Sequence, residues 1–364
     1  MTYTELKIRL MQQGAVFAPS ARRTMCASSS GEISFMDYAT TGGVVMVLDE
    51  RVYANVPVKF RDTPFRVELQ ADRLILLCHE LPLPHSVRII PVPKYALDAR
   101  RLSDGTLVSD AVMTHADRVR ISPVNGCAFH CSFCTCNHLV YWEKPCALLD
   151  EAFRIALADP YNRPRHALIS GGTPKTTAES YEWLNAVYHH FPTTYPDMEF
   201  DVMLSPRCLT PAPHCAEGYT DFLRFLRDDC GVRTLSVNLE LYNETYRRRL
   251  IPEKAAIGVE NYRLFIKKAV DIFGPMTVRS SLIAGLEPAE DTLLGVRLLS
   301  EIGCIPVLSA FVPAPGTDGA ACPAPAPEFL LELVEKAGSA AGACGLPLGP
   351  LCRPCAHNSI TMED

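Results

Sequence analysis

Residues 125–136 read N-G-C-A-F-H-C-S-F-C-T-C and space Cys127, Cys131 and Cys134 as C-x3-C-x2-C. On one short loop, this spacing lets three sulfur atoms converge on one point. Cysteine thiolates are preferred ligands of iron–sulfur clusters and of soft metal ions. Because a closed cluster site has four cysteines, a [4Fe–4S] cluster held here would keep one iron open for an exchangeable ligand.

Two other interpretations of this loop remain open at this point. A closed zinc site needs a fourth ligand, which Cys136, His130 or His138 would supply. The cysteines would otherwise carry no metal at all. Motifs further along the chain favour the cluster.

The composition is that of an ordinary globular protein. Apolar residues make up 48% of the 364 residues, which suffices for one large domain and a smaller one. No apolar run is long enough to span a membrane, and the first residues lack the apolar core of a signal peptide. We therefore expect a cytoplasmic protein whose 15 cysteines are reduced thiols and metal ligands. The net charge of −6 argues against wide nucleic-acid contact.

From Arg118 onward, strand-like and helix-like segments alternate. Strands are predicted at 118–123, 165–170, 198–204, 234–239, 276–284 and 305–312. Helices are predicted at 148–158, 177–190, 219–229, 259–273, 290–302 and 327–341. Six successive β/α units imply a parallel sheet with helices outside, curled into a partial or full barrel. The cysteine loop follows the first strand, at the end where such barrels carry their chemistry.

The region before this alternation has a different pattern. A short helix is predicted at 4–13, and strands at 44–48, 52–60, 65–69, 74–78 and 87–92. The chain therefore divides into a β-rich cap domain (1–117), a partial barrel (118–318) and a C-terminal helix with a cysteine-containing tail (319–364).

Two later strand ends carry polar or glycine-rich sequences. Ser170-Gly171-Gly172-Thr173-Pro174 ends the second strand, and its glycines let the backbone approach a ligand closely. In the fourth strand, alternation puts Ser236, Asn238 and Glu240 on one face. Three polar side chains facing a barrel interior indicate a polar ligand there.

Together these motifs resemble the radical S-adenosylmethionine (SAM) superfamily over residues 118–318, with a pattern closest to the biotin and lipoyl synthase-like group. The loop is similar to that family's C-x3-C-x-aromatic-C signature, with Phe133 as the aromatic residue. Gly171 and Gly172 resemble the family's G-G-E segment, although Thr173 replaces the glutamate.

The other matches lie at later strand ends. Asn238 and Glu240 resemble the N-x-N-x-E/D strand, and 246–249 resembles the Tyr-Arg-x-Arg segment of lipoyl synthases. This resemblance implies that an arginine, here Arg249, pairs with the SAM carboxylate. Ile283 and Gly285 resemble the fifth-strand motif that backs the adenine, with Glu287 one residue early. Residues 311–317, including Val312, resemble the sixth-strand ending.

The resemblance implies a partial (β/α)6 TIM-like barrel of the radical SAM type, with the N-terminal β-rich domain added. It also implies an enzyme that binds a [4Fe–4S] cluster and SAM and needs an external one-electron donor such as flavodoxin or ferredoxin. Reductive cleavage of SAM would yield a 5′-deoxyadenosyl radical that abstracts hydrogen from a small-molecule substrate. Sulfur insertion, rearrangement and C–C bond chemistry stay open, as do a peptide-modifying enzyme and a non-catalytic zinc or iron–sulfur protein.

The tail holds a second cysteine set. Cys344, Cys352 and Cys355 are followed by His357, with Cys322 upstream. They suit an auxiliary iron–sulfur cluster or a zinc ion, or carry no metal. Cys136 is left without an assigned role. Packing positions are predicted for Cys208, Cys215 and Cys230.

Overall fold

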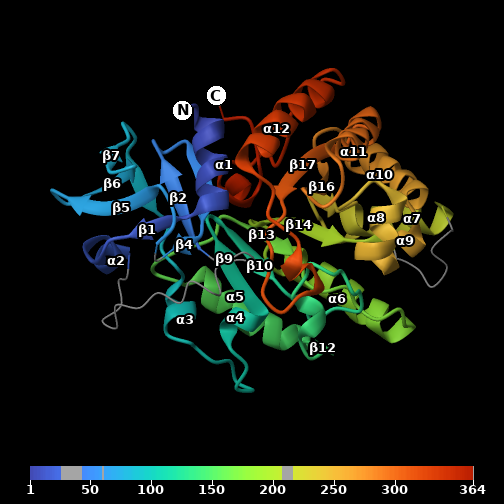
Figure 1. Cartoon of the computed structure of the whole chain (residues 1–364). Coiled ribbons are helices and arrows are strands. Elements are labelled where there is room, and N and C mark those ends of the chain that lie inside the picture. The colour runs from blue at the N-terminus through green and yellow to red at the C-terminus, as the bar shows by residue number, and fades with distance from the viewer. Residues whose placement is uncertain (26–42, 60, 207–215, 364) are drawn as a thin grey trace.

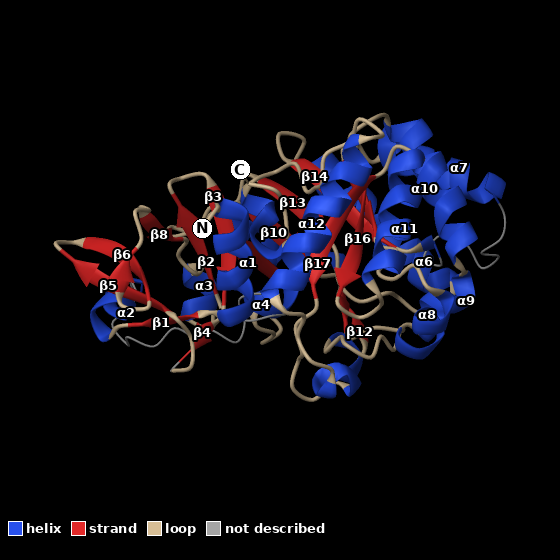
Figure 2. Ribbon diagram, turned by 45° about the horizontal axis from the view of Figure 1, so that its top comes forward, coloured by secondary structure: helices blue, strands red, loops and turns tan. Residues whose placement is uncertain are grey.

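The computed structural model of the chain describes residues 1–25, 43–59, 61–206 and 216–363 (Figure 1). Two large β-sheets dominate it, one of seven strands and one of eight. Each has its own apolar core, because the buried residues around the seven-stranded sheet and those of the N-terminal sheet form separate clusters. Helices α1 (Tyr3–Gln13) and α12 (Pro327–Gly342) lie side by side between the two sheets (Figures 1 and 2).

The seven-stranded sheet has the order β17-β16-β15-β14-β13-β10-β9. All neighbours are parallel except the edge strand β9, which pairs antiparallel with β10. Its strands are β9 (Val112–His115), β10 (Arg118–Ile121), β13 (His166–Ile169), β14 (Glu199–Leu204), β15 (Thr234–Val237), β16 (Val278–Ala284) and β17 (Ile305–Ala310). The six predicted parallel strands are therefore confirmed, as an open sheet in sequential order.

Helices connect these strands as predicted. The main ones are α5 (Cys146–Leu157), α6 (Ala178–Thr194), α7 (Ala216–Arg224), α10 (Val259–Phe273), α11 (Ala289–Glu301) and α12 (Pro327–Gly342). The predicted helix 219–229 is only partly α-helical, since Phe225–Asp229 forms a π-helical turn closed by the bond from the Cys230 amide to the Phe225 carbonyl. Within the described ranges, we find no helix with the length and apolar character needed to cross a membrane.

Short elements at the strand ends were not predicted. After β15 come α8 (Glu244–Leu250) and α9 (Pro252–Ile257), and the cysteine loop is flanked by the small hairpin β11 (Val124–Asn125) and β12 (Trp142–Glu143). Because they contain only two to seven residues, these elements leave little periodic signal in the sequence. Of these elements, β11 contributes Val124 and α9 contributes Lys254 to the lining of the candidate site.

The predicted N-terminal strands form the second sheet, in the order β3-β2-β8-β6-β5-β1-β4 with β7 beside β6. The strands are β1 (Ala15–Phe17), β2 (Val44–Leu48), β3 (Val52–Val56), β4 (Val58–Lys59), β5 (Phe65–Gln70), β6 (Arg73–Cys78), β7 (Leu81–Pro82) and β8 (Val87–Ile89). The predicted strand 52–60 is two strands because Pro57 has no N–H to donate; Phe60 lies outside the described residues. The division of the chain into domains at 117 and 318, and the capping role of this sheet, remain predictions.

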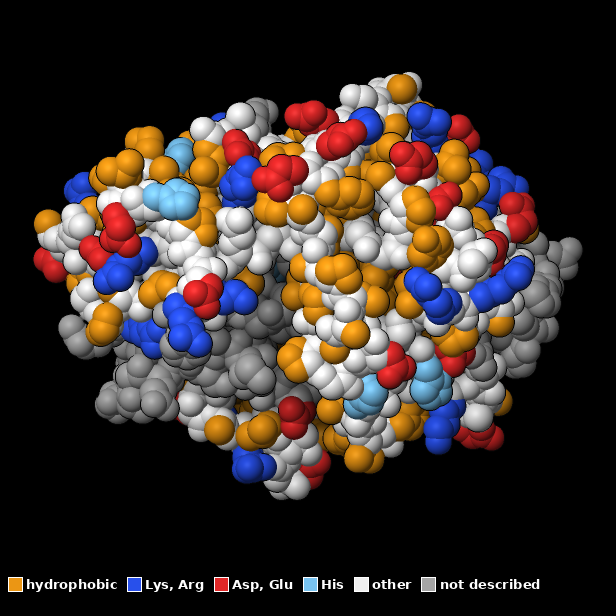
Figure 3. Space-filling model, viewed as in Figure 1, with side chains coloured by type: hydrophobic (Ala, Val, Ile, Leu, Met, Phe, Trp, Pro, Cys, Tyr) orange, Lys and Arg blue, Asp and Glu red, His pale blue; other side chains and the backbone are white. Residues whose placement is uncertain are grey.

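The two ends of the chain meet where α1 contacts the C-terminal tail. The helices not yet given, together with a turn of the tail, are short. They are α2 (Pro19–Met25), α3 (Lys94–Leu97), α4 (Val108–Ala111) and the 3₁₀ turn η5 (Pro354–Asn358). The buried Lys7 ammonium bonds the Thr361 hydroxyl and the Glu363 carboxylate, both at 2.6 Å. On the face seen in Figure 3, acidic and basic side chains are interspersed.

Arg247 of α8 secures the connection after β15. Its side chain is 0% exposed and donates to the carbonyls of Leu239 (2.8 Å), Leu241 (2.6 Å) and Lys254 (2.8 Å). Burial lowers the pKa of Arg247, opposed by the nearby Tyr262 and by acidic neighbours. The guanidinium therefore works as a backbone clamp and is not directed at a ligand.

We expect Arg247→Met to lower the free energy of unfolding by about 3 kcal/mol or more, because buried carbonyls lose their donors. Urea denaturation followed by circular dichroism measures the effect. The exposed neighbour Arg248 provides the matched control, and Arg248→Met should stay within about 0.5 kcal/mol of the parent. Equal midpoints for the two variants would show that the clamp contributes nothing.

Candidate active site

A cavity of about 160 Å³ lies at the carboxyl ends of β10, β13, β14 and β15. Three groups of predicted site residues line it together: the three cysteines with Phe133, the Ser170–Pro174 strand end, and the polar pair Asn238 and Glu240. Sequence reasoning missed Lys254, Met203 and Ser205, which also line it. Their only sequence signal is position, because Met203 and Ser205 lie at the end of β14 and Lys254 lies in the connection that follows β15.

The cysteine loop is held from three sides by backbone hydrogen bonds. The Ala128 amide donates to the Thr173 carbonyl (2.9 Å), and the Ser132 amide donates to the Leu250 carbonyl (2.8 Å). From the tail side, the Gly319 amide donates to the Ser132 carbonyl at 2.7 Å. The loop therefore has a defined shape set by segments far apart in the sequence.

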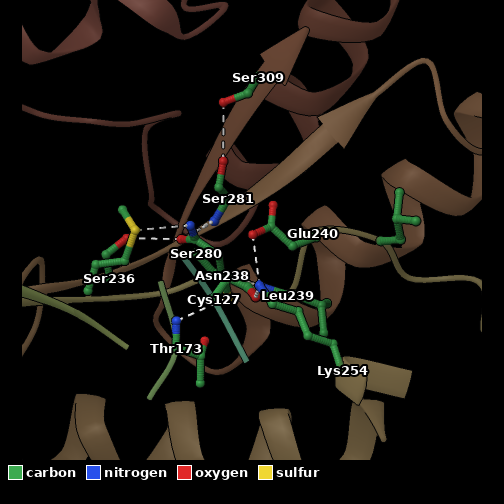
Figure 4. Close-up of polar contacts among 12 residues, drawn as sticks. Cys127, Thr173, Ser236, Asn238, Leu239, Glu240, Lys254, Ser280, Ser281 and Ser309 are labelled. Carbon is green, nitrogen blue, oxygen red and sulfur yellow. Dashed lines mark hydrogen bonds and ion pairs between the residues drawn. The ribbon is translucent and has the colours of Figure 1, made fainter. Parts of the chain in front are cut away.

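Cys127 lies where two backbone amides meet its sulfur. The amides of Phe129 (3.3 Å) and Thr173 (3.1 Å) both donate to Sγ, and Figure 4 shows the second of these bonds. Donors aimed at a sulfur ligand stabilise its negative charge. At Cys131, burial raises the thiol pKa to about 12, against the opposing effect of Lys254. Metal binding there releases a proton, since only a thiolate is a ligand.

Cys136 lies against the third predicted ligand, Cys134. The pKa of Cys136 is lowered to about 7, chiefly by a hydrogen bond between these two thiols and also by the charge of Arg120, while burial acts in the opposite direction. The same hydrogen bond, together with burial, raises the pKa of Cys134. Unlike Cys134, Cys136 is not among the residues that line the cavity.

The histidines considered as a fourth zinc ligand turn elsewhere. The ring of His130 is 68% exposed and its Nδ1 lies 2.8 Å from Glu253 Oε1. His138 is exposed. Neither lines the cavity, so the geometry does not supply the fourth protein ligand through either side chain.

Gly172 makes the contact between the loop and the end of β13 possible. A Cβ atom at this position would lie 1.7 Å from the Gly126 carbonyl oxygen and 2.8 Å from the Cys127 Cα. Both atoms belong to backbone, which cannot yield. The close approach predicted for a ligand is therefore made, in this structure, by the cysteine loop itself.

The polar residues after β15 form a connected group (Figure 4). Ser236 is buried beneath the cavity and its hydroxyl donates to Asn238 Oδ1 at 3.0 Å. Glu240 Oε1 accepts from the Lys254 ammonium at 2.8 Å, with these side chains 15% and 11% exposed. Burial lowers the pKa of Lys254, but the charge and hydrogen bond of Glu240, together with Tyr262 and Cys131, outweigh burial and the pKa is raised. A carboxylate and an ammonium group thus share one wall.

Other predicted cofactor residues lie away from this lining. Ile283 packs with Phe133, Leu250 and Phe311 in an apolar cluster beside the loop. Gly285 has φ +101°, and a Cβ there would meet Pro325 at 2.8 Å. Val312 is half-buried just after β17. Arg249 is exposed with its guanidinium over the Tyr246 ring, so the sequence resemblance points to an arginine that the fold turns outward.

The tail cysteines do not gather as one set. Cys344 is exposed at the end of α12, and Cys322 packs in the apolar cluster beside the loop. Cys352 and Cys355 instead face His166, the first residue of β13, at the amino end of the sheet. Buried Cys230 has the predicted packing role, whereas Cys208 and Cys215 lie outside the described residues.

Comparisons with known proteins give partial similarities. No family model matches the chain. Over 108 residues, 29% of this chain, it is 32% identical to the bacteriochlorophyllide c C-7(1)-hydroxylase of Chlorobaculum limnaeum, of which the match spans only 27%.

Solved structures with a similar chain course include a radical SAM methyltransferase from Sphaerobacter thermophilus (TM-score 0.46, 17% identity, covering 81% of this chain and 77% of that chain). A second is the FeFe-hydrogenase maturase HydG from Carboxydothermus hydrogenoformans (TM-score 0.46, 15% identity, covering 64% of this chain and 52% of that chain). A third is methylornithine synthase, PylB (TM-score 0.45, 13% identity, covering 63% of this chain and 69% of that chain).

We expect Gly172→Ala to push the cysteine loop off the end of β13, at a cost of roughly 1–3 kcal/mol in unfolding free energy. The loop thiols should then react faster with a maleimide, as measured by mass spectrometry of the labelled peptides. Gly342→Ala is the control, because a Cβ there meets nothing within 4 Å. If both variants label and unfold alike, the contact at Gly172 does not hold the loop.

Proposed function

We propose that the chain is a radical SAM enzyme that holds a [4Fe–4S] cluster on Cys127, Cys131 and Cys134 and binds SAM beside it. The observation that carries this proposal is one cavity, at the carboxyl ends of parallel strands, lined by these three sulfurs and by Gly171–Thr173. Three thiolates fit a cluster with one open iron better than a closed zinc site, because no histidine of the loop turns toward them and Cys136, although hydrogen-bonded to Cys134, is not among the residues that line the cavity.

When bound, the cluster and SAM would supply a one-electron reductive cleavage that yields methionine and a 5′-deoxyadenosyl radical. The chain's own task is to bind, orient and exclude water. The amides of Phe129 and Thr173 stabilise charge on the Cys127 sulfur. The apolar cluster around Phe133, Leu250 and Phe311 shelters the other side of the loop.

The Glu240–Lys254 pair gives the cavity groups for both ends of an amino acid. A carboxylate attracts the ammonium group of SAM, and an ammonium attracts its carboxylate. Lys254, rather than the exposed Arg249, is therefore the proposed counter-ion of the SAM carboxylate. Ser236 and Asn238 hold the strand end that presents this pair.

The position of the tail supports a proposal about the fate of the substrate radical. His166, which Cys352 and Cys355 face, begins β13, and Ser170 follows the last residue of that strand, roughly 13 Å away along it. A tail cluster at that distance is badly placed to donate sulfur, which favours rearrangement, C–C bond chemistry or another reaction at a C–H bond. The partial relative named for a carbon hydroxylation agrees with this class. A small molecule is the proposed substrate, and flavodoxin or ferredoxin the type of electron donor.

We expect Cys127→Ala to abolish 5′-deoxyadenosine formation from SAM and dithionite after anaerobic reconstitution. Loss of one of three thiolates removes the cluster, so bound iron should fall from about four per chain to near zero. Chromatography of the nucleoside products and a colorimetric iron assay measure both effects.

Cys344→Ala is the matched control, because this cysteine is exposed and lies outside the cavity. It should keep both iron and activity. Zinc without iron on the cysteine loop, or undiminished 5′-deoxyadenosine from Cys127→Ala, contradicts the proposed function.

Lys254→Met should raise the Kd for SAM roughly tenfold or more, since a hydrogen-bonded charge is lost and Glu240 is left unpaired. Anaerobic equilibrium dialysis with the reconstituted protein measures this. Lys267→Met, an exposed lysine on α10, controls for the loss of charge alone. An unchanged Kd with bound iron intact would remove Lys254 from the binding site.

A further inference from the structure

Four potential metal ligands converge at the opposite end of the main sheet from the cysteine loop. Asp117 lies in the two-residue turn between β9 and β10, and His166 begins β13. Cys352 and Cys355 come from the tail, around the start of η5. One ligand atom from each residue lies within 4.8 Å of the other three.

Four of the six distances between these atoms match the edges of a tetrahedron around one ion, and the other two are within 4.8 Å. His166 Nε2 lies 3.3 Å from Asp117 Oδ1, 3.6 Å from Cys352 Sγ and 3.4 Å from Cys355 Sγ, and Cys352 Sγ lies 3.8 Å from Asp117 Oδ1. Zinc bond lengths give tetrahedral edges of about 3.3 Å between nitrogen and oxygen and about 3.5 Å between sulfur and either of them. The observed edges differ from these values by only a few tenths of an ångström.

The ligand types select among metals. Two thiolates from a C-x2-C pair, one imidazole and one carboxylate suit zinc, whereas iron–sulfur clusters are mostly held by four cysteines. We propose that Asp117, His166, Cys352 and Cys355 form a structural zinc site. Because four protein side chains complete the tetrahedron, no position is left for substrate.

The surroundings balance the charge of such a site. Two thiolates, a carboxylate and Zn²⁺ sum to one negative charge. The cavity of about 340 Å³ that borders His166 and both cysteines is lined by three arginines and two carboxylates, which leave a formal charge of +1: Arg118, Arg165, Arg279, Glu199 and Asp201. The turn holding Asp117 is itself fixed, because its carbonyl accepts from the Arg165 amide at 2.7 Å.

The site would fasten the tail to the start of the parallel sheet. Beside it the tail covers the edge strand β17, where Gly349 bridges Val307 and Ile360 bridges Leu308. Beyond it the tail reaches α1 through Thr361 and Glu363. The zinc would therefore join three segments distant in the sequence: the β9–β10 turn, the start of β13 and the C-terminal tail.

The test is metal analysis of the full-length chain purified without added metal. Inductively coupled plasma mass spectrometry should give close to one zinc per chain. His166→Ala and Cys352→Ser should each lower zinc affinity about tenfold or more. His166→Cys, which restores a ligand, should recover it. Replacing zinc with Co²⁺ should give the visible absorption of a tetrahedral cobalt–thiolate site, which reports the ligand set even where a variant folds poorly.

Two control variants separate this site from the cysteine loop. Cys344→Ser should retain zinc, and a Cys127/Cys131/Cys134 triple alanine variant should retain zinc while losing iron. Zinc unaffected by His166→Ala and Cys352→Ser, iron and sulfide that depend on Cys352 and Cys355, or a chain free of zinc would each overturn the proposal. None of these outcomes bears on the iron of the cysteine loop. The zinc proposal and the proposed radical SAM function can therefore be contradicted independently.

Discussion

The contact between the cysteine loop and the glycine end of β13 is the constraint on which the candidate site depends. The Gly126 carbonyl and the Cys127 Cα occupy the space that any side chain at position 172 would need. Because the two backbones touch, the Thr173 amide reaches the Cys127 sulfur and the Thr173 carbonyl reaches the Ala128 amide. The segments that follow the first two parallel strands therefore line the cavity together. The Cys127 sulfur already accepts hydrogen bonds from two backbone amides.

The connection after β15 forms the opposite wall of the cavity, and its conformation is held by a buried side chain. Glu240 has φ +67°, a left-handed conformation that is uncommon for a residue with a side chain. Arg247 stabilises this bent segment by bonding three carbonyls, one of which belongs to Lys254. Removal of this side chain would leave buried carbonyls without donors. The stability of the segment and the proposed SAM site therefore both depend on Arg247.

The two ends of the parallel sheet carry different groups of cysteines. At the carboxyl end, three sulfurs line a cavity with polar side chains around it. At the amino end, two sulfurs meet a histidine and a carboxylate at single-ion distances. The first arrangement leaves room for an exchangeable partner, whereas the second is complete without one. The proposed cluster site and the proposed structural zinc site can therefore occur at opposite ends of one sheet.

Local sequence specified the alternation of strands and helices, because periodicity and β-branched runs act within a few residues. It also specified the cysteine loop and a close backbone approach at Gly171 and Gly172, although the structure shows that the group approaching Gly172 is the cysteine loop. Only the tertiary structure decided which polar groups meet them. Lys254 reaches the cavity from the short helix α9, and Arg249, two residues after buried Arg247, lies on the opposite, exposed side of α8. Cys352 lies beside His166, which is 186 residues away in the sequence, and not with Cys344, with which the sequence had grouped it. Such meetings depend on where the chain bends after each strand and how the tail packs, which no local pattern encodes.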